Sequence, residues 1–180
     1  MKIFRKIYEV KNIFFSFCRV IKIKLLYSNI KINFRSRINK NCDIHCDNNS
    51  IIVLENVSLA RGVILHAKNG GVIKVSHSYI GYNSIIVSIN KITIESNTEI
   101  AEMVVIRDQN HNFNFSDTPI SKQGYNHSPI IIESNVWIGA KSTVLKGVRI
   151  GKSSIIGAHS LVNKSIPNQS LAFGIPAKIK

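Results

Sequence analysis

Residues 130–164 read IIIESNVWIGAKSTVLKGVRIGKSSIIGAHSLVNK, and large aliphatic side chains recur in this stretch at every sixth position. They are Ile132, Ile138, Val144, Ile150, Ile156 and Val162. A helix would place apolar residues three and four positions apart, and a half-buried strand would alternate them. A spacing of six suits a short strand followed by a tight corner. Such coils stack into a prism, a parallel β-helix, whose axis the aliphatic side chains fill.

Two neighbouring positions of the repeat support this fold. The residue after the aliphatic is glycine at Gly139, Gly151 and Gly157. Glycine tolerates a sharp turn with positive φ, so we expect these glycines to adopt that conformation at the corners. The residue two positions before the aliphatic is small or β-branched throughout. This set is Ile130, Val136, Ser142, Val148, Ser154 and Ser160.

Four short motifs make the chain resemble a known family. They are residues 135–140 (NVWIGA), 148–151 (VRIG), 156–158 (IGA) and 174–178 (GIPAK). From about Val53 to the C-terminus, the chain is similar to hexapeptide-repeat acyltransferases of the galactoside, maltose and capsular polysaccharide O-acetyltransferase type. The resemblance implies an all-β fold, a left-handed parallel β-helix of hexapeptide repeats. It also implies a homotrimer that binds acetyl-coenzyme A (acetyl-CoA) between neighbouring subunits.

Two segments depart from the repeat and define the organisation of the chain. We expect a basic amphipathic helix over residues 1–30, the β-helix domain over residues 31–180, and a loop extruded from that domain over residues 112–129. In the first segment, apolar residues recur three and four positions apart. This stripe is Ile3, Ile7, Val10, Phe14, Phe17, Ile21 and Leu25, and the cations around it are Lys2, Arg5, Lys6, Lys11, Arg19, Lys22 and Lys24.

Charges interrupt the helix too often for a membrane span, and no cleavage site of a secretory signal follows it. Two interpretations remain open. The stripe packs across the open end of the β-helix or against a neighbouring subunit, where it covers an unpaired sheet edge; we favour this one. Alternatively, residues 1–28 make a peripheral contact with an anionic membrane.

The composition limits the partners of the chain. A formal net charge of +14 over 180 residues favours anionic partners, such as an acidic glycan, coenzyme A phosphates or a membrane face. No nucleic-acid-binding motif accompanies this charge, so we expect no nucleic acid. The three cysteines are an odd number, which favours a reducing compartment. Cys42, His45 and Cys46 lack the spacing of a known zinc module, and we expect no metal.

We expect the chemistry where the repeat breaks, after Ile106. Long excursions from a regular scaffold are usually functional. The resemblance implies a catalytic histidine at the root of an extended loop, and His111 occupies that position. An imidazole can remove the proton of an alcohol as that alcohol attacks a thioester. Asp108 and Asn110 are near enough in sequence for either one to orient the ring.

Further site residues follow from the resemblance. Trp137 precedes a core isoleucine and therefore points outward, where it would contact the acetyl group and acceptor, or else pack between subunits. His127 and Asn83 are weaker candidates for substrate contact. The positions implied to bind acetyl-CoA are Gly139, Ala140, Ala158, Lys164 and Lys178. A backbone N–H at Gly139 or Ala140 could also stabilise the developing oxyanion.

The expected function is O-acetylation of a bacterial surface glycan or its precursor, such as capsule, O-antigen or sialic acid, in the cytoplasm or at the inner face of the membrane. Gly81 and Ile89 stand where galactoside-type enzymes place asparagine and aspartate, so we do not expect a simple galactoside as acceptor. The alternatives are N-acetylation of a nucleotide-linked amino sugar and streptogramin-type antibiotic acetylation. From other classes, a zinc carbonic anhydrase and a non-catalytic trimeric scaffold stay open.

Overall fold

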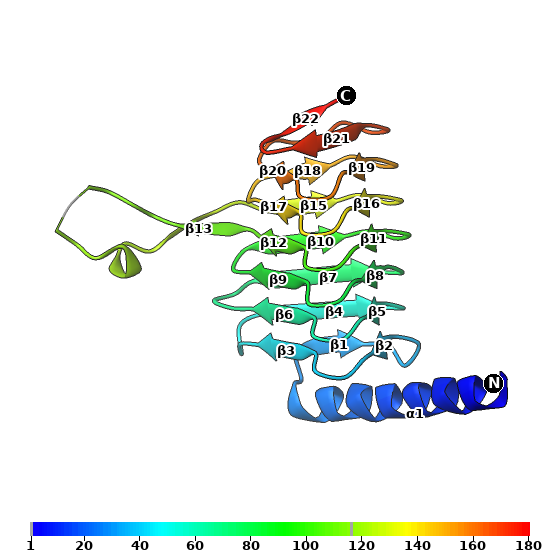
Figure 1. The fold of residues 1–180 in the computed structure, drawn as a ribbon. Coiled ribbons are helices and arrows are strands. Elements are labelled where there is room, and N and C mark those ends of the chain that lie inside the picture. Colours follow the sequence, from blue (N-terminus) through cyan, green and yellow to red (C-terminus); the bar gives the residue numbers. More distant parts are fainter. Residues whose placement is uncertain (1, 116) are drawn as a thin grey trace.

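The computed structural model describes residues 2–115 and 117–180, with the backbone alone for residues 2, 3 and 5–8. Within this range, short parallel strands stack as successive coils, and one helix crosses the N-terminal end (Figure 1). The predicted fold class, an all-β parallel β-helix with an N-terminal helix and one extruded loop, is confirmed. Met1 and the predicted helix side chains Lys2, Ile3, Arg5, Lys6 and Ile7 lie outside the described residues.

The strands form three sheets, which are the three faces of the prism. Face A contains β1 (Ile30–Ile32), β4 (Ile51–Glu55), β7 (Val72–Ser76), β10 (Lys91–Ile94), β15 (Ile130–Ile132) and β18 (Arg149–Ile150). Face B contains β2 (Arg37–Ile38), β5 (Ser58–Leu59), β8 (Tyr79–Ile80), β11 (Glu99–Ile100), β16 (Trp137–Ile138), β19 (Ile155–Ile156), β21 (Leu171–Gly174) and β22 (Ala177–Ile179). Face C contains β3 (Asp43–Cys46), β6 (Ile64–Ala67), β9 (Ile85–Ser88), β12 (Val105–Arg107), β17 (Thr143–Val144) and β20 (Leu161–Val162). The chain visits the faces in the order A, B, C in each coil.

The core follows from the repeat. β10 pairs with β15 and β15 with β18, so Ile94, Ile132 and Ile150 lie above one another in register. All six aliphatic residues of the predicted repeat are fully buried. The small position is buried as well, and its serines bind the next coil: the Ser142 hydroxyl donates to the Gly157 carbonyl oxygen at 2.9 Å. Burying a polar hydroxyl in the core is tolerated because it has this partner.

Glycine is required at these corners for a different reason from the one predicted. The expectation of positive φ at Gly139, Gly151 and Gly157 is wrong, because the left-handed conformation lies two residues later. Those residues are Lys141, Ser153 and His159. Glycine is required here by the close approach of the next coil. A Cβ on Gly139 would lie 2.5 Å from the backbone nitrogen of Ala158, and one on Gly157 would lie 2.8 Å from the Cβ of Phe173.

The helix α1 (Lys2–Leu26) closes the N-terminal end of the prism, but with another face than the predicted stripe. Ser16 and Val20 are buried against the first coil. The Ser16 hydroxyl accepts the Ile38 N–H at 2.8 Å, and Arg19 donates to the Ile38 carbonyl oxygen at 3.3 Å. The first coil offers unpaired backbone groups, so the helix turns Ser16 and Arg19 toward it, while Val20 and Ile23 on the same side pack against the core. The predicted packing of the apolar stripe on this end is therefore wrong.

The extruded loop is an arm that stands out from the corner between faces C and A (Figure 1). Its root is an antiparallel hairpin of β13 (Gln109–His111) and β14 (Tyr125–His127), and a short 3-10 helix, η1 (Ile120–Lys122), lies farther out. Regular structure therefore begins three residues before the predicted loop. The pairing places His111 directly opposite Tyr125.

Asp108 fastens this arm to the prism. Its carboxylate is fully buried and accepts hydrogen bonds from the Ser88 hydroxyl at 2.6 Å and from the backbone N–H groups of Ile89 and Asn90, both at 2.9 Å. These partners belong to the corner of the coil below, and His111 is not among them. The predicted role of Asp108 in orienting the His111 ring is corrected accordingly: the carboxylate holds the base of the arm.

We predict that Asp108→Asn lowers the free energy of unfolding by about 1–3 kcal/mol, because an amide cannot accept from all three donors and leaves a buried polar group unpaired. Denaturant titration followed by circular dichroism measures the loss. The matched control is the exposed neighbour in Asn110→Ala, which should stay within about 0.5 kcal/mol of the wild type. Equal stability of Asp108→Asn and the wild type would contradict the assignment.

Candidate active site

A cleft of about 360 Å³ lies at the root of the arm. The lining residues come from three successive corners between faces C and A. The polar ones are Lys68 and Asn69 from the second coil, and Arg107, Gln109, Asn110, His111 and Tyr125 from the fourth coil and its arm. Val87 and Ile89 supply the apolar part. Because stacked corners bring residues far apart in sequence together, the cleft holds two cations beside one histidine.

His111 is exposed at this cleft. Its ring centroid lies 4.4 Å from that of Tyr125, with an angle of 39° between the planes. Within the described residues, no hydrogen bond is formed by the His111 side chain, so both ring nitrogens remain available to a substrate. Asn110 also lines the cleft, but the structure shows no contact from its side chain to the His111 ring.

His127 has a structural partner at the other end of the hairpin. The side-chain amide of Asn90 donates to its Nδ1 at 2.8 Å, and the Ser128 N–H donates to the Asp108 carbonyl oxygen at 2.9 Å. Together with the Asp108 carboxylate, these bonds fix the arm where it leaves the prism. His127 therefore lies near His111 as a fastening of the arm, outside the lining of the cleft.

A second group of predicted site residues lies on the other side of the prism. Trp137 is on β16 in face B and is 54% exposed, in agreement with its predicted outward direction. Asn83, Gly139, Ala140 and Ala158 lie at corners between faces B and C. Asn83 has a φ of 55° and occupies the left-handed corner position, which asparagine tolerates.

The backbone N–H groups of this second group differ in whether they already have a hydrogen-bond partner. The Gly139 N–H donates to the Ile156 carbonyl oxygen at 2.8 Å, so it is not free to bind an oxyanion. Among the described residues, the N–H groups of Ala140 and Ala158 have no such partner. They belong to successive coils. Ala140 is partly exposed and Ala158 is exposed. Of the two predicted oxyanion donors, only Ala140 thus remains.

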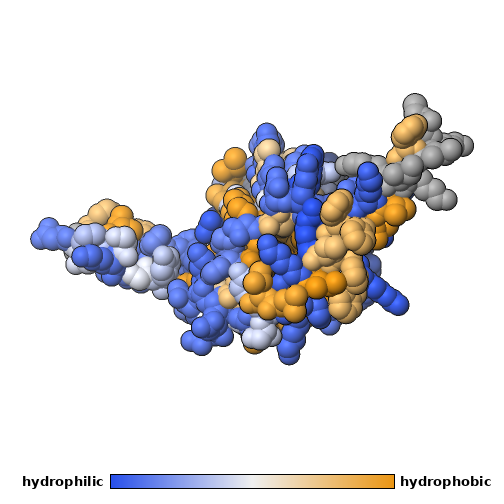
Figure 2. Space-filling model, turned by 90° about the horizontal axis from the view of Figure 1, so that it is seen from below, coloured by the Kyte–Doolittle hydropathy of each residue, from blue (hydrophilic) through white to orange (hydrophobic). Residues whose placement is uncertain are grey.

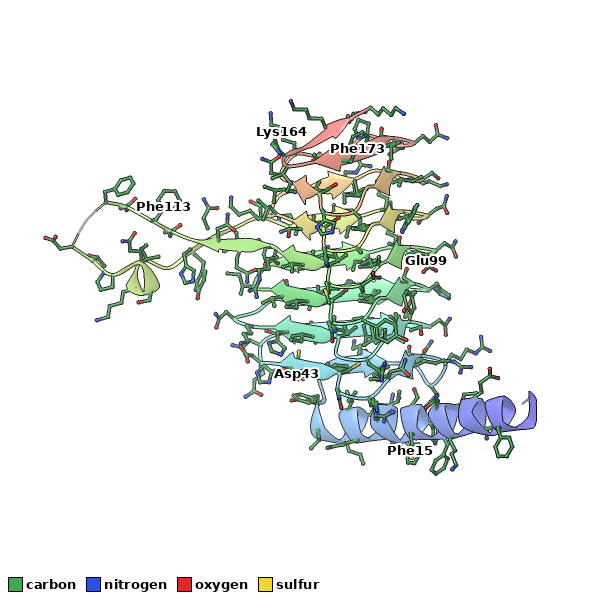
Figure 3. All side chains as sticks on the ribbon, in the orientation of Figure 1. Phe15, Asp43, Glu99, Phe113, Lys164 and Phe173 are labelled. Carbon is green, nitrogen blue, oxygen red and sulfur yellow. The ribbon has the colours of Figure 1, made fainter. Side chains whose placement is uncertain are left out.

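Lys164 follows β20 at a corner between faces C and A, on the same side of the prism as the arm (Figure 3), and Lys178 lies on β22. Both side chains are exposed. Neither belongs to the cleft around His111. Within the described residues there is no group of histidine, cysteine and carboxylate side chains that could hold a metal ion.

One chain does not bring the two groups together. The arm leaves the corner between faces C and A, and face B with Trp137 is the face that does not adjoin this corner. Figure 1 shows β13 and β16 on opposite sides of the prism. The histidine and the tryptophan of a single subunit therefore cannot act on one substrate.

Of the nine residues that line the cleft, the sequence predicted only Asn110 and His111 as site residues. The polar residues that were not predicted are Lys68, Asn69, Arg107, Gln109 and Tyr125. Lys68 precedes His111 by two full coils, and only the stacking of the corners brings it near. Tyr125 becomes a neighbour of His111 through the hairpin register. The one available signal was the polar insertion of residues 68–71, which marks the same corner as the later arm.

Comparison with known proteins supports the repeat. Residues 129–164 match the family model "Bacterial transferase hexapeptide (six repeats)". The chain is 32% identical over 176 residues to the "Putative lipopolysaccharide biosynthesis O-acetyl transferase WbbJ" of Escherichia coli, covering 93% of this chain and 81% of that protein. It is 37% identical over 102 residues to the galactoside O-acetyltransferase of Escherichia coli, covering 56% of this chain and 49% of the relative, about half its length.

Among solved structures, AntD from Bacillus cereus has a similar fold. AntD is an N-acyltransferase crystallised with dTDP and 3-hydroxybutyryl-CoA. The TM-score is 0.77, and the alignment covers 92% of this chain and 88% of AntD. At 20% identity this likeness concerns the fold. The similarity to the lipopolysaccharide enzyme over nearly its whole length, together with the hexapeptide match, places the chain in the family of hexapeptide-repeat acyltransferases, as an acetyl-CoA-dependent enzyme.

Proposed function

We propose that this protein transfers an acetyl group from acetyl-CoA to a hydroxyl of a bacterial surface glycan or of its precursor. The observation that carries the proposal is the exposed His111 in a cleft with Lys68 and Arg107. The relative named for lipopolysaccharide biosynthesis supports the acceptor class. We place the reaction in the cytoplasm, since the three cysteines, all free, suit a reducing compartment.

The reaction needs one base and no covalent enzyme intermediate. A ring nitrogen of His111 removes the proton of the acceptor hydroxyl as the oxygen attacks the thioester carbonyl. The carbon–sulfur bond then breaks, coenzyme A leaves, and the proton passes from the imidazole to the departing sulfur. Stacking on Tyr125 limits the rotation of the ring and so helps to orient it.

Acetyl-CoA is the second substrate, and we assign its contacts to the group around Trp137. The N–H groups of Ala140 and Ala158 are suited to bind carbonyl oxygens along the pantetheine arm. The Ala140 N–H is also the donor proposed for the oxyanion, because the Gly139 N–H is occupied. Lys178 is an exposed point charge for the phosphates. Lys164 lies on the same side of the prism as the arm, so it could meet these phosphates only from a neighbouring subunit.

This assignment requires more than one subunit, and we propose the homotrimer that the family resemblance implies. His111 and Trp137 face opposite ways in one chain, so a productive site needs the arm of one subunit and face B of the next. A cyclic arrangement repeats this pairing at each interface, and every histidine then has a partner. The arm would reach over the neighbour, which accounts for its length beyond the prism (Figure 1).

The cleft favours an acidic acceptor. Lys68 is partly buried and Arg107 exposed, and neither has an ion pair with a described carboxylate. A guanidinium and an ammonium that flank a catalytic base are well placed to bind a sugar carboxylate. A diphosphate would also satisfy both cations. This second possibility favours the alternative acceptor, a nucleotide-linked amino sugar, for which the reaction would be N-acetylation.

We predict that His111→Asn lowers kcat/KM for acetyl transfer by about 10²–10⁴, because the general base is lost. The assay follows release of free coenzyme A with a panel of acidic and neutral bacterial glycans and nucleotide-linked amino sugars. His77→Asn, at an exposed corner between faces A and B with left-handed φ, is the matched control and should keep full activity. If His111→Asn retains wild-type turnover while folded, another group is the base.

We predict that Lys68→Gln and Arg107→Gln each raise KM for an acidic acceptor by about tenfold, which corresponds to about 1.4 kcal/mol of lost charge-assisted binding. Neutral acceptors should be unaffected. Lys74→Gln, on β7, removes an exposed charge outside the cleft and the arm and serves as control. A preference for neutral sugars, unchanged in both variants, would reject the acidic acceptor but leave the acetyl transfer intact.

A further inference from the structure

The outer face of α1 is apolar and uncovered. Val10, Phe14, Phe17, Ile21 and Leu25 lie three and four residues apart and therefore share one side of the helix. All are exposed, Phe14 by 61% and Leu25 by 81%. Together with Phe15 they form what we call the outer apolar face; the centre of the stripe lies about 120° around the helix from the buried Ser16 and Val20.

Most of this face points away from the prism, and at its edge the Phe17 ring packs against Phe34 of the first coil, with 5.6 Å between the ring centroids. Phe15 projects from α1 on the side opposite the first coil (Figure 3). Viewed from that end, hydrophobic side chains gather along the helix with basic ones between them (Figure 2). An exposed apolar surface of this kind on a folded protein marks an interaction site.

Positive charge is concentrated at the same end. Residues 1–42 contain eleven lysines and arginines and one acid, Glu9, and so carry ten of the fourteen net positive charges. Lys11 and Lys22 are exposed on the outer side of the helix. Amphipathic helices that lie in a membrane interface combine a basic polar face with aromatic and aliphatic residues. Among the described residues, no helix is long and apolar enough to cross a membrane.

The positive charge favours a membrane over a second copy of this chain as the partner of the outer apolar face. Two such ends brought face to face would oppose ten net positive charges to ten, which strongly disfavours the contact. In the proposed trimer, a cyclic axis parallel to the prism would place the neighbours beside it and all three helices at one end, with the side of α1 turned away from the prism uncovered. An anionic lipid surface complements both the charge and the apolar side chains.

We propose that the outer apolar face of α1 docks the protein on an anionic lipid bilayer. Docking by three α1 helices at once rests on the proposed trimer. The arm leaves the fourth coil, three strand spacings from the first, so the His111 cleft stands about 14 Å above the first coil at about 4.8 Å per strand. The helix α1, about 10 Å across, lies below that coil, so the cleft is about 25 Å above the lipid surface. Sugar residues carried on a lipid at that surface are within reach of the cleft, which makes a lipid-linked glycan the acceptor that fits this geometry.

Vesicle sedimentation tests the docking. We expect the wild-type protein to pellet with vesicles of phosphatidylcholine and phosphatidylglycerol, to stay in solution with phosphatidylcholine alone, and to lose binding at high salt. Phe14→Ser combined with Leu25→Ser should weaken binding about tenfold or more. Lys11→Gln combined with Lys22→Gln should weaken it on the anionic vesicles. Phe115→Ser, at a fully exposed aromatic on the arm, is the control and should bind as the wild type.

Three results would overturn the inference: absence of wild-type binding to anionic vesicles, equal binding by the Phe14 and Leu25 variant, or a native mass of two trimers that this variant reduces to one. The last result would assign the face to a second copy. Acetyl transfer to a soluble acceptor is measured in the same preparations. Retained transfer without vesicle binding rejects the docking alone, and loss of transfer by every preparation rejects the proposed function.

Discussion

The hydrogen-bond ladder between successive coils is the constraint on which the rest of the structure depends. Parallel strands fix a spacing of about 4.8 Å, and each coil can then add only one narrow layer of side chains to the axis. This spacing brings the backbone of Ala158 so close to Gly139 that no Cβ fits. It also leaves backbone groups without partners at the first coil. Ser16 and Arg19 satisfy those of Ile38, and this requirement decides how α1 is oriented.

The same constraint separates what the sequence could predict from what it could not. A repeat of six residues is local, so the burial of Ile132 or Val162 was predictable from the pattern alone. The face that α1 turns to the prism was not, because the stripe of Phe14 and Leu25 is the better hydrophobic pattern, while the hydrogen-bonding groups of Ile38 are visible only in three dimensions. The partners of the Asp108 carboxylate lie a full coil earlier in the chain, and the stacking of Tyr125 on His111 depends on a hairpin register that no nearby pattern encodes.

The site is divided by the shape of the prism. The histidine that we propose as the base stands on an arm at one corner, and the residues proposed to bind acetyl-CoA, apart from Lys164, lie on or next to the face opposite this corner. A monomer of this shape would hold two half-sites that never meet. We therefore regard assembly as part of the active site: each arm supplies a base to the neighbour's groove, and the α1 helices, gathered at one end, present the assembly to a surface that carries the acceptor.

The most direct test of this account is whether the arm of one subunit reaches face B of another. A photoreactive p-benzoylphenylalanine in place of Phe113, which is exposed on the arm, would be activated in the native protein, and the attachment site would be mapped by mass spectrometry. The account predicts covalently linked chains, with the arm joined to residues around Trp137 of a second subunit. A monomeric native mass, with links only within one chain, would contradict it.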